Sequence, residues 1–146
     1  MAHAQIDDGK SYRLQDRNSG HFLQVYGDNA IVSDSNSPED TWIFHRAGGV
    51  FWKLENARNH KHLQADPNDD NEARNVDTWL HTGEPGQALW RIESCGDGYS
   101  VLTNQKYAQQ LEVGGARTDN NANVNLWRHN LNAPPPQSQW KIMDAT

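Results

Sequence analysis

A five-residue stretch, Asp40-Thr41-Trp42-Ile43-Phe44, recurs in form as Ala88-Leu89-Trp90-Arg91-Ile92 and as Ser138-Gln139-Trp140-Lys141-Ile142. The three tryptophans are spaced by 48 and 50 residues. A repeat at this period indicates similar units that cannot each bury an apolar face alone and must share one core. We therefore expect three units, each closed by one Trp.

Each unit also opens alike, with a short run of alternating apolar and polar residues followed by a polar turn. The opening runs are Tyr12-Arg13-Leu14, Trp52-Lys53-Leu54 and Tyr99-Ser100-Val101-Leu102. The second runs are Phe22-Leu23-Gln24-Val25, His62-Leu63-Gln64-Ala65 and Gln110-Leu111-Glu112-Val113. The third runs are residues 75–81 and 123–129, each with a Trp-x-His ending, whereas unit one has only Ile31-Val32-Ser33-Asp34-Ser35. Alternation at this spacing predicts strands.

Short strands joined by Gly, Asn, Asp and Pro turns, with no helical periodicity, indicate an all-β domain. Threefold pseudo-symmetry would close the sheet edges of such a domain. We predict a β-trefoil of three pseudo-symmetric four-stranded repeats, over about residues 9–49, 50–97 and 98–146. A length of 146 residues suits one domain, residues 1–146. The alternative architecture, a β-sandwich, does not predict three Trp-terminated units.

The composition argues against several kinds of partner. The net charge is −6 and the chain has no Lys/Arg cluster, so nucleic acid and anionic membrane surfaces are poor partners. No apolar run approaches the roughly 20 residues of a membrane span, and residues 1–8 lack the features of a signal peptide. The single cysteine, Cys95, excludes an intrachain disulfide. We expect no membrane insertion and a cytoplasmic or non-classically secreted protein.

No motif indicates a metal, a cofactor or catalysis. Residues 66–72 alternate oxygen-bearing side chains as a Ca²⁺ loop does, but lack its Gly at the sixth position. His60 and His62 alternate on an expected strand and would share one face, yet no third ligand is evident. No Ser or Cys lies in a nucleophile motif. We therefore expect no cofactor, no metal and no catalytic residue.

From about Ser11 to Met143 the sequence resembles the ricin B-type (R-type) β-trefoil lectin family. Its repeats end in Gln-x-Trp and carry a Leu-Asp-Val-like strand, an Asn-rich turn and a Val-x-Leu-Trp strand. The clearest matches are Leu111-Glu112-Val113, residues 120–127 and Ser138-Gln139-Trp140. The chain departs from the pattern at the Gln of Gln-x-Trp, replaced by Asp40, Ala88 and Ser138, and at the Asp of the second strand, replaced by Gln24, Gln64 and Glu112. The cysteines usual in secreted members are also absent.

The resemblance implies a non-catalytic lectin that binds glycans or glycoconjugates containing galactose or N-acetylgalactosamine. Such a pocket needs an aromatic plate for the C–H face of a sugar, beside carboxylate or amide groups for its hydroxyls. The implied set in repeat three is Glu112, Trp127 and Gln137, with Asn125 and His129 nearby. In repeat two it is Gln64, Trp79 and Gln87, with Asp66, Asp77 and His81.

An alternative role for Trp79 and Trp127 is packing in the hydrophobic core. Because Trp42, Trp90 and Trp140 already fill the core positions, we expect Trp79 and Trp127 to face outward. In repeat one Gln24 has no aromatic partner, with Ser35 in the place of the Trp, so we expect an inactive or altered pocket there. Useful avidity would come from two pockets per chain or from a homodimer.

The main alternative function is a β-trefoil protein-binding module, such as a protease inhibitor, acting through its loops. The run Pro134-Pro135-Pro136 favours this alternative if it forms a rigid exposed loop. The alternative gives no reason for the Trp-x-His segments in two repeats. An enzyme ranks last, because the sequence offers no convergent set of titrating groups.

Overall fold

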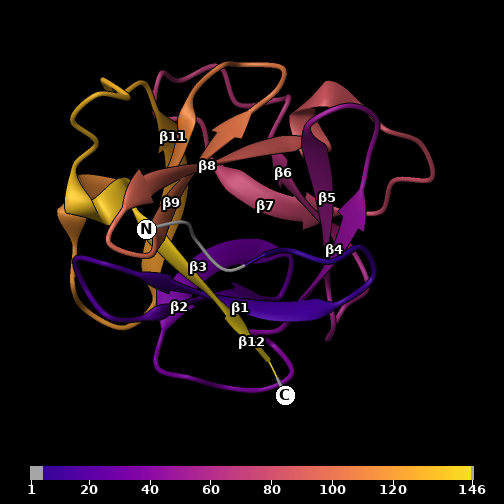
Figure 1. Ribbon diagram of the computed structural model, residues 1–146, viewed down its shortest axis with the longest axis horizontal. Helices are drawn as coiled ribbons and strands as arrows, with labels where there is room; N and C mark the ends of the chain where they lie inside the picture. The colour runs from indigo at the N-terminus through magenta and orange to yellow at the C-terminus, as the bar shows by residue number, and fades with distance from the viewer. Residues whose placement is uncertain (1–4, 146) are drawn as a thin grey trace.

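The computed structural model describes residues 5–145, in which twelve strands and three short 3₁₀ turns, but no α-helix, are formed (Figure 1). The expected all-β class is confirmed. The strands are β1 (Ser11–Asp16), β2 (Phe22–Tyr26), β3 (Asn29–Ser33), β4 (Trp42–Arg46), β5 (Phe51–Asn56), β6 (His62–Ala65), β7 (Val76–Trp79), β8 (Trp90–Gly96), β9 (Tyr99–Asn104), β10 (Gln110–Val113), β11 (Ala122–Trp127) and β12 (Trp140–Asp144). The 3₁₀ turns are η1 (Gly86–Ala88), η2 (Gly114–Ala116) and η3 (Pro136–Ser138).

Residues 1–4, part of the stretch that lacks signal-peptide features, and residue 146 lie outside the described range. Within residues 5–145 no helix is long and apolar enough to cross a bilayer. Within the same range no three His, Cys, Asp or Glu side chains converge as metal ligands.

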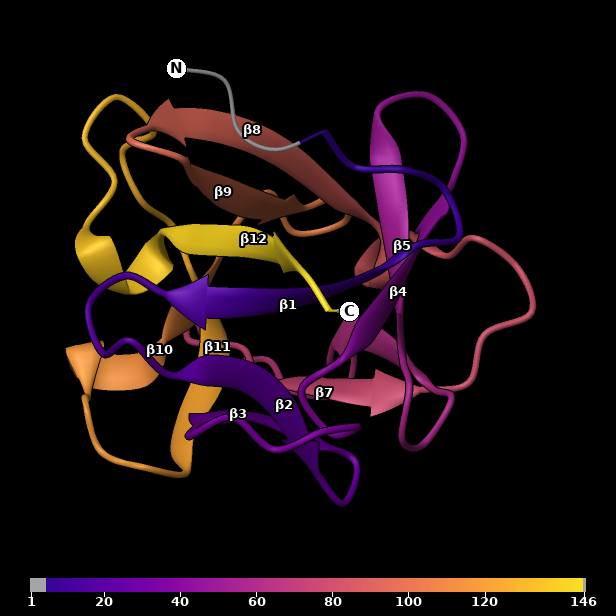
Figure 2. The ribbon, with the colours of Figure 1, turned by 60° about the horizontal axis from the view of Figure 1, so that its bottom comes forward.

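Six strands pair into a closed ring in the order β1, β4, β5, β8, β9 and β12. Each strand is antiparallel to both of its neighbours, and the pairing of β12 with β1 closes the ring by placing Leu14 opposite Ile142. Figure 2 shows β12 lying beside β1, so the last strand of the chain pairs with the first. Ring closure leaves none of these six strands with a free edge, which is where unrelated chains would otherwise add.

The other six strands form three hairpins, β2–β3, β6–β7 and β10–β11, which meet one another. Three amides link them in a closed ring. Asn75 Nδ2 donates to Asn29 Oδ1 at 2.9 Å, Asn29 Nδ2 to Asn123 Oδ1 at 2.8 Å, and Asn123 Nδ2 to Asn75 Oδ1 at 2.9 Å. This asparagine ring (Asn29, Asn75 and Asn123) takes one residue from each of the three hairpin regions.

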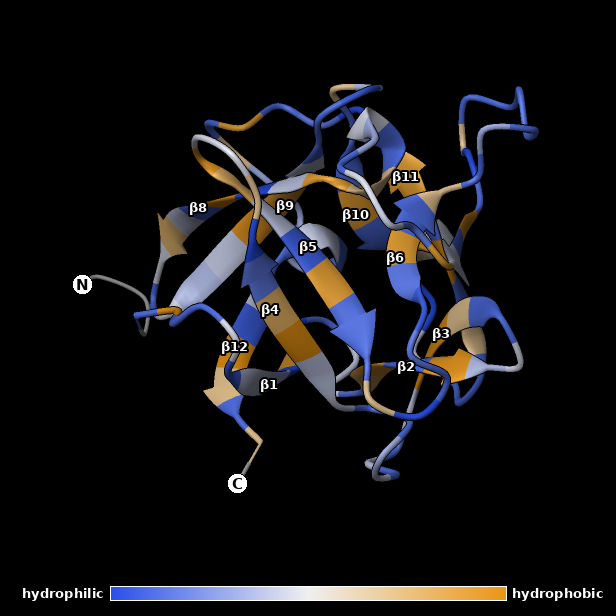
Figure 3. Cartoon of the chain, turned by 90° about the vertical axis from the view of Figure 1, so that its right-hand side faces the viewer, coloured by the Kyte–Doolittle hydropathy of each residue, from blue (hydrophilic) through white to orange (hydrophobic). Residues whose placement is uncertain are grey.

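The core is organised around the three repeated tryptophans, and Figure 3 shows hydrophobic residues along the strands and hydrophilic ones in most of the loops. Trp42, Trp90 and Trp140 are fully buried. Their indole N–H groups donate to the backbone oxygens of Leu23 (2.9 Å), Leu63 (3.0 Å) and Leu111 (3.1 Å). Each of these leucines is followed directly by Gln24, Gln64 or Glu112. The closing Trp of each unit is therefore hydrogen-bonded to the strand that carries Gln24, Gln64 or Glu112.

The end of each opening strand is also built alike, with one exception. Asn56 and Asn104 donate from Nδ2 to the backbone oxygens of Glu39 and Gln87, both at 2.9 Å. Asp16 ends β1 at the corresponding place and has no N–H group to donate. Its Oδ2 atom is buried without a hydrogen-bond partner. Burial, as the largest cause, raises the pKa of Asp16 to about 6.

We expect Asp16→Asn to stabilise the fold by about 2 kcal/mol at pH 7.5 and by much less at pH 4. The folded pKa of Asp16, about 6, lies above its ordinary value of 3.8, so ionising the carboxyl costs folding free energy as pH rises through this window. The stability that the protonated carboxyl contributes is present below pH 4 and lost above pH 6. Urea unfolding of both proteins at the two pH values measures the difference, and an equal difference at both would contradict this explanation.

Candidate functional site

The register of the hairpins places polar and aromatic residues next to one another on one face. In β10–β11, Gln110 pairs with Trp127 and Glu112 with Asn125. In β6–β7, His62 pairs with Trp79 and Gln64 with Asp77. Residues two apart on a strand share a face, so each hairpin presents three polar side chains and an indole together.

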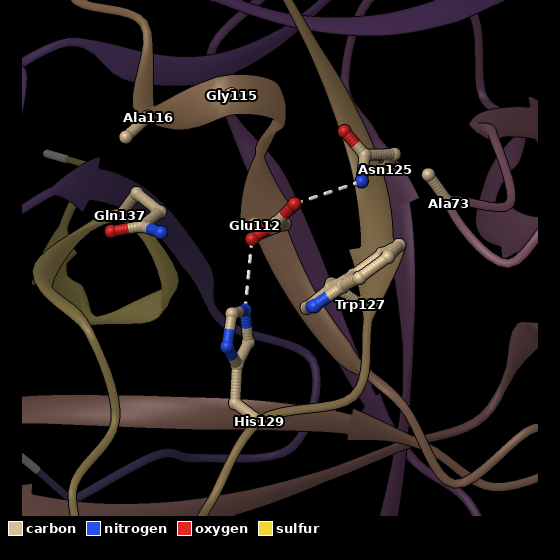
Figure 4. Close-up of a pocket in the computed structure, with 8 residues that line it drawn as sticks. All are labelled: Ala73, Glu112, Gly115, Ala116, Asn125, Trp127, His129 and Gln137. Atoms are coloured by element: carbon tan, nitrogen blue, oxygen red, sulfur yellow. Dashed lines mark hydrogen bonds and ion pairs between the residues drawn. The ribbon is translucent and has the colours of Figure 1, made fainter.

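The third hairpin forms a pocket of about 350 Å³, which we call site three. Figure 4 shows Glu112 bonded to Asn125 and His129, with Trp127 and Gln137 to either side in this view. Trp127 is 38% exposed. The lining residues are Glu112, Asn125, Trp127, His129 and Gln137, with Ala73, Gly115 and Ala116.

Glu112 is buried, and its carboxylate is fixed by two donors. Oε2 accepts from Asn125 Nδ2 at 3.0 Å, and Oε1 accepts from His129 Nε2 at 2.8 Å. The backbone N–H of His129 donates in turn to Gln110 Oε1 at 2.8 Å. A carboxylate has about four acceptor positions, so Glu112 keeps capacity for ligand hydroxyls after binding these two donors.

Gln137 reaches site three from η3, which the proline run supports. Gln139 Nε2 donates to the backbone oxygen of Pro134 at 2.7 Å, and Ser138 Oγ donates to that of Pro135 at 3.0 Å. The run 134–136 is therefore bonded to the turn that carries Gln137. This arrangement gives the prolines a role in site three.

The second hairpin forms a pocket of about 410 Å³, which we call site two. Gln64 Nε2 donates to Asp77 Oδ1 at 2.9 Å, and His81 Nε2 lies 2.8 Å from Gln64 Oε1. Trp79 is 58% exposed. The lining residues are Gln64, Asp66, Asp77, Trp79, His81 and Gln87, with Pro67 and Asn68.

Sites two and three use the same three positions, with the amide and the carboxylate exchanged. In site three the second strand supplies the carboxylate, Glu112, and the third strand the amide, Asn125. In site two the second strand supplies the amide, Gln64, and the third strand the carboxylate, Asp77. Both pairs are completed by a histidine two residues past the Trp. Either arrangement pairs one donor with one acceptor across the hairpin, which satisfies both groups.

His81 of site two and its neighbour His62 both have pKa values below the ordinary histidine value. Burial, assisted by the nearby charge of Lys53, lowers the pKa of His62 to about 4 and also lowers the pKa of His81. A neutral His62 accepts the backbone N–H of His81 at Nδ1, 3.1 Å away. Burial raises the pKa of Asp77, with a counteracting contribution from the hydrogen bond of Gln64.

The structure brings together every site residue named from the sequence, in two pockets. It also adds small residues from neighbouring turns, Ala73, Gly115 and Ala116 at site three, and Pro67 and Asn68 at site two. No chemical signal marks these residues in the sequence, because they contribute through backbone position. A Cβ atom added at Gly114, beside them, would lie 2.3 Å from Asn125 Oδ1, so a larger residue there would displace the Asn125 side chain from its place in site three.

Two details of register predicted from the sequence were wrong. Phe22 pairs with Ser33, as Gln110 pairs with Trp127, so Ser33 and not Ser35 stands in the place of the Trp in unit one. His60 lies in a turn with φ of 61° and contacts Glu55, so it does not alternate with His62 on a strand.

In unit one the residues at the equivalent positions do not form a site like sites two and three. Gln24 is buried and donates from Nε2 to the backbone oxygen of Asp34 at 2.8 Å. Ile31, which is also buried, pairs with Gln24 at the position of Asp77 and Asn125. Unit one therefore lacks both the polar partner and the indole that sites two and three have.

A ring of paired strands, three contacting hairpins and two pockets on those hairpins define a β-trefoil binding domain. The chain belongs to the ricin-type beta-trefoil lectin domain-like family, whose sequence profile matches residues 38–127. The family makes carbohydrate the general class of ligand. Among curated protein sequences, none matches the chain.

Solved structures share the fold over nearly the whole chain. A designed threefold-symmetric protein, ThreeFoil, is 26% identical with a TM-score of 0.84, over 92% of this chain and 98% of that one. The ricin B-like lectin of Macrolepiota procera, solved in complex with lactose, is 18% identical with a TM-score of 0.80, over 97% and 99%.

The same fold also occurs within a larger enzyme. An exo-β-1,3-galactanase from Clostridium thermocellum is 18% identical with a TM-score of 0.84. The match covers 97% of this chain but 31% of the galactanase chain. The chain therefore corresponds to one part of that enzyme.

Proposed function

We propose that the domain is a non-catalytic lectin of three pseudo-symmetric four-stranded repeats, in which site two and site three each bind galactose or N-acetylgalactosamine. The observation that carries this proposal is the recurrence of one constellation at two places. Each site holds an exposed Trp beside a carboxylate–amide pair completed by a histidine. An indole receives the apolar face of a sugar, while the fixed polar pair exchanges hydrogen bonds with its hydroxyls.

The choice of sugar is supported by the Macrolepiota procera lectin, since lactose contains galactose. Binding of one monosaccharide at a shallow pocket is weak, so two sites per chain would supply avidity on a surface dense in glycans. A homodimer would increase the avidity further. The first repeat contributes structure and no binding.

We expect Trp127→Ala and Trp79→Ala each to remove binding at one site, with the apparent Kd on a galactose-bearing glycan array rising about tenfold or more in each case. Both indoles are substantially exposed, so the melting temperature should change by only a few degrees. Tyr26→Ala is the matched control, because Tyr26 is 77% exposed and lines neither site. The double variant Trp79→Ala/Trp127→Ala should bind no glycan. Wild-type binding by that double variant would contradict the proposed sites.

A further inference from the structure

A second hollow, of about 250 Å³, adjoins site three and shares Trp127 with it. Its other lining residues are Glu72, Gln109 and Arg128. Glu72 directly precedes Ala73, which lines site three. We call this the outer hollow. Trp127 thus belongs to both spaces, and the chain passes from one space to the other between Glu72 and Ala73.

The outer hollow is built from two units that are fastened together. Gln109 Nε2 donates to the backbone oxygen of Glu72 at 3.1 Å, which joins the loop after β6 to the start of β10. The guanidinium of Arg74 lies 3.7 Å from the ring centre of Tyr107, which attaches the same loop to the third unit at a second point. The loop is therefore held against site three.

Its polar groups remain available to a ligand. Within residues 5–145 neither the Glu72 carboxylate nor the Arg128 guanidinium has an ion pair or a side-chain hydrogen bond, and Gln109 Oε1 accepts none. One negative and one positive group leave the hollow without net charge. Acceptors and donors beside an indole suit a neutral sugar residue, because each hydroxyl both donates and accepts.

Site two differs at the corresponding positions. Lys61 and Leu80 stand there in place of Gln109 and Arg128. Lys61 lies over the Trp79 ring, with Nζ 5.8 Å from the ring centre, and pairs with Asp28 at 2.8 Å. Trp79 is therefore already packed against a protein cation outside site two, and Leu80 offers no hydrogen bond.

We propose that site three and the outer hollow together bind two consecutive residues of a neutral glycan chain, with Trp127 between them, whereas site two binds one residue. This inference rests on the proposed function. It assigns to Arg128, Gln109 and Glu72 the recognition of the second sugar.

The test compares methyl β-galactoside with lactose, by calorimetric titration of variants that keep one site. In Trp79→Ala, which keeps site three, lactose should bind about tenfold more tightly than the galactoside. Adding Glu72→Ala and Arg128→Ala, which remove side chains that line only the outer hollow, should reduce this ratio below about twofold while leaving the Kd of the galactoside unchanged. In Trp127→Ala, which keeps site two, the ratio should already be below about twofold. The matched change there, Leu80→Ala, should not alter it.

Equal binding of the two sugars at site three would overturn the inference, as would a ratio that survives loss of the Glu72 and Arg128 side chains. Both results leave galactose binding intact and so leave the proposed function standing. If neither sugar binds the unsubstituted protein, the proposed galactose specificity fails and this inference fails with it.

Discussion

Trp140→Ala is expected to lower the free energy of unfolding by about 4 kcal/mol, the largest loss of stability from a single substitution that we predict. Trp140 is fully buried, and truncating it leaves a cavity in the shared core. It also removes the donor to the Leu111 backbone oxygen, 3.1 Å away, which is then unpaired in the interior. For a chain of this size the melting temperature should fall by roughly 10–15 °C.

The same substitution should also weaken site three, because Leu111 precedes Glu112 on β10. Thermal unfolding monitored by circular dichroism measures the stability. Trp127→Ala is the control, since it removes the same side chain from a partly exposed position outside the shared core and should cost less than about 1 kcal/mol. Similar losses in the two variants would show that Trp140 does not have the structural role assigned to it.

Glu112→Gln is expected to reduce galactose affinity at site three about 100-fold, measured by titration in the Trp79→Ala background. With His129 still donating from Nε2, the new amide receives this N–H on its oxygen, so its NH₂ group faces the NH₂ group of Asn125. Two donors then oppose each other in a buried place, and the charge that strengthens bonds to sugar hydroxyls is lost.

Adding Asn125→Asp to Glu112→Gln should restore at least about tenfold of the lost affinity. The double variant has the amide–carboxylate arrangement that Gln64 and Asp77 form in site two. Asn125→Asp alone should be as harmful as Glu112→Gln, because it places two carboxylates side by side. If the double variant is no better than Glu112→Gln, the exchange of groups between the sites has no functional meaning.

The sequence predicted the all-β class from local alternation, whereas the members of both sites were implied by the resemblance to the R-type lectins, whose motif positions the structure gathers into two pockets. A closing Trp, a polar residue on the second strand and a Trp-x-His segment are each readable within a few residues. The outward position of Trp79 and Trp127 also followed, since Trp42, Trp90 and Trp140 account for the core.

Register and long-range contacts could not be predicted in this way. A two-residue turn, Gly27-Asp28, fixes Ser33 opposite Phe22, and its length cannot be deduced from alternation alone. The outer hollow depends on a loop of unit two that reaches unit three through Glu72 and Gln109. No sequence pattern in either segment predicts that contact. The buried, unpaired oxygen of Asp16 likewise becomes visible only by comparison with Asn56 and Asn104.

The asparagine ring separates what must stay constant in this molecule from what is free to diverge. Within the ring, Asn29, Asn75 and Asn123 each give one hydrogen bond and receive one, so replacing any one of them would open the ring. Two residues further along each chain segment the side chains differ in charge and polarity: Ile31 is apolar, Asp77 is a carboxylate and Asn125 is an amide. The contact among the three hairpins thus depends on identical residues, while the neighbouring position can differ in each unit without altering the hydrogen bonds that join the hairpins.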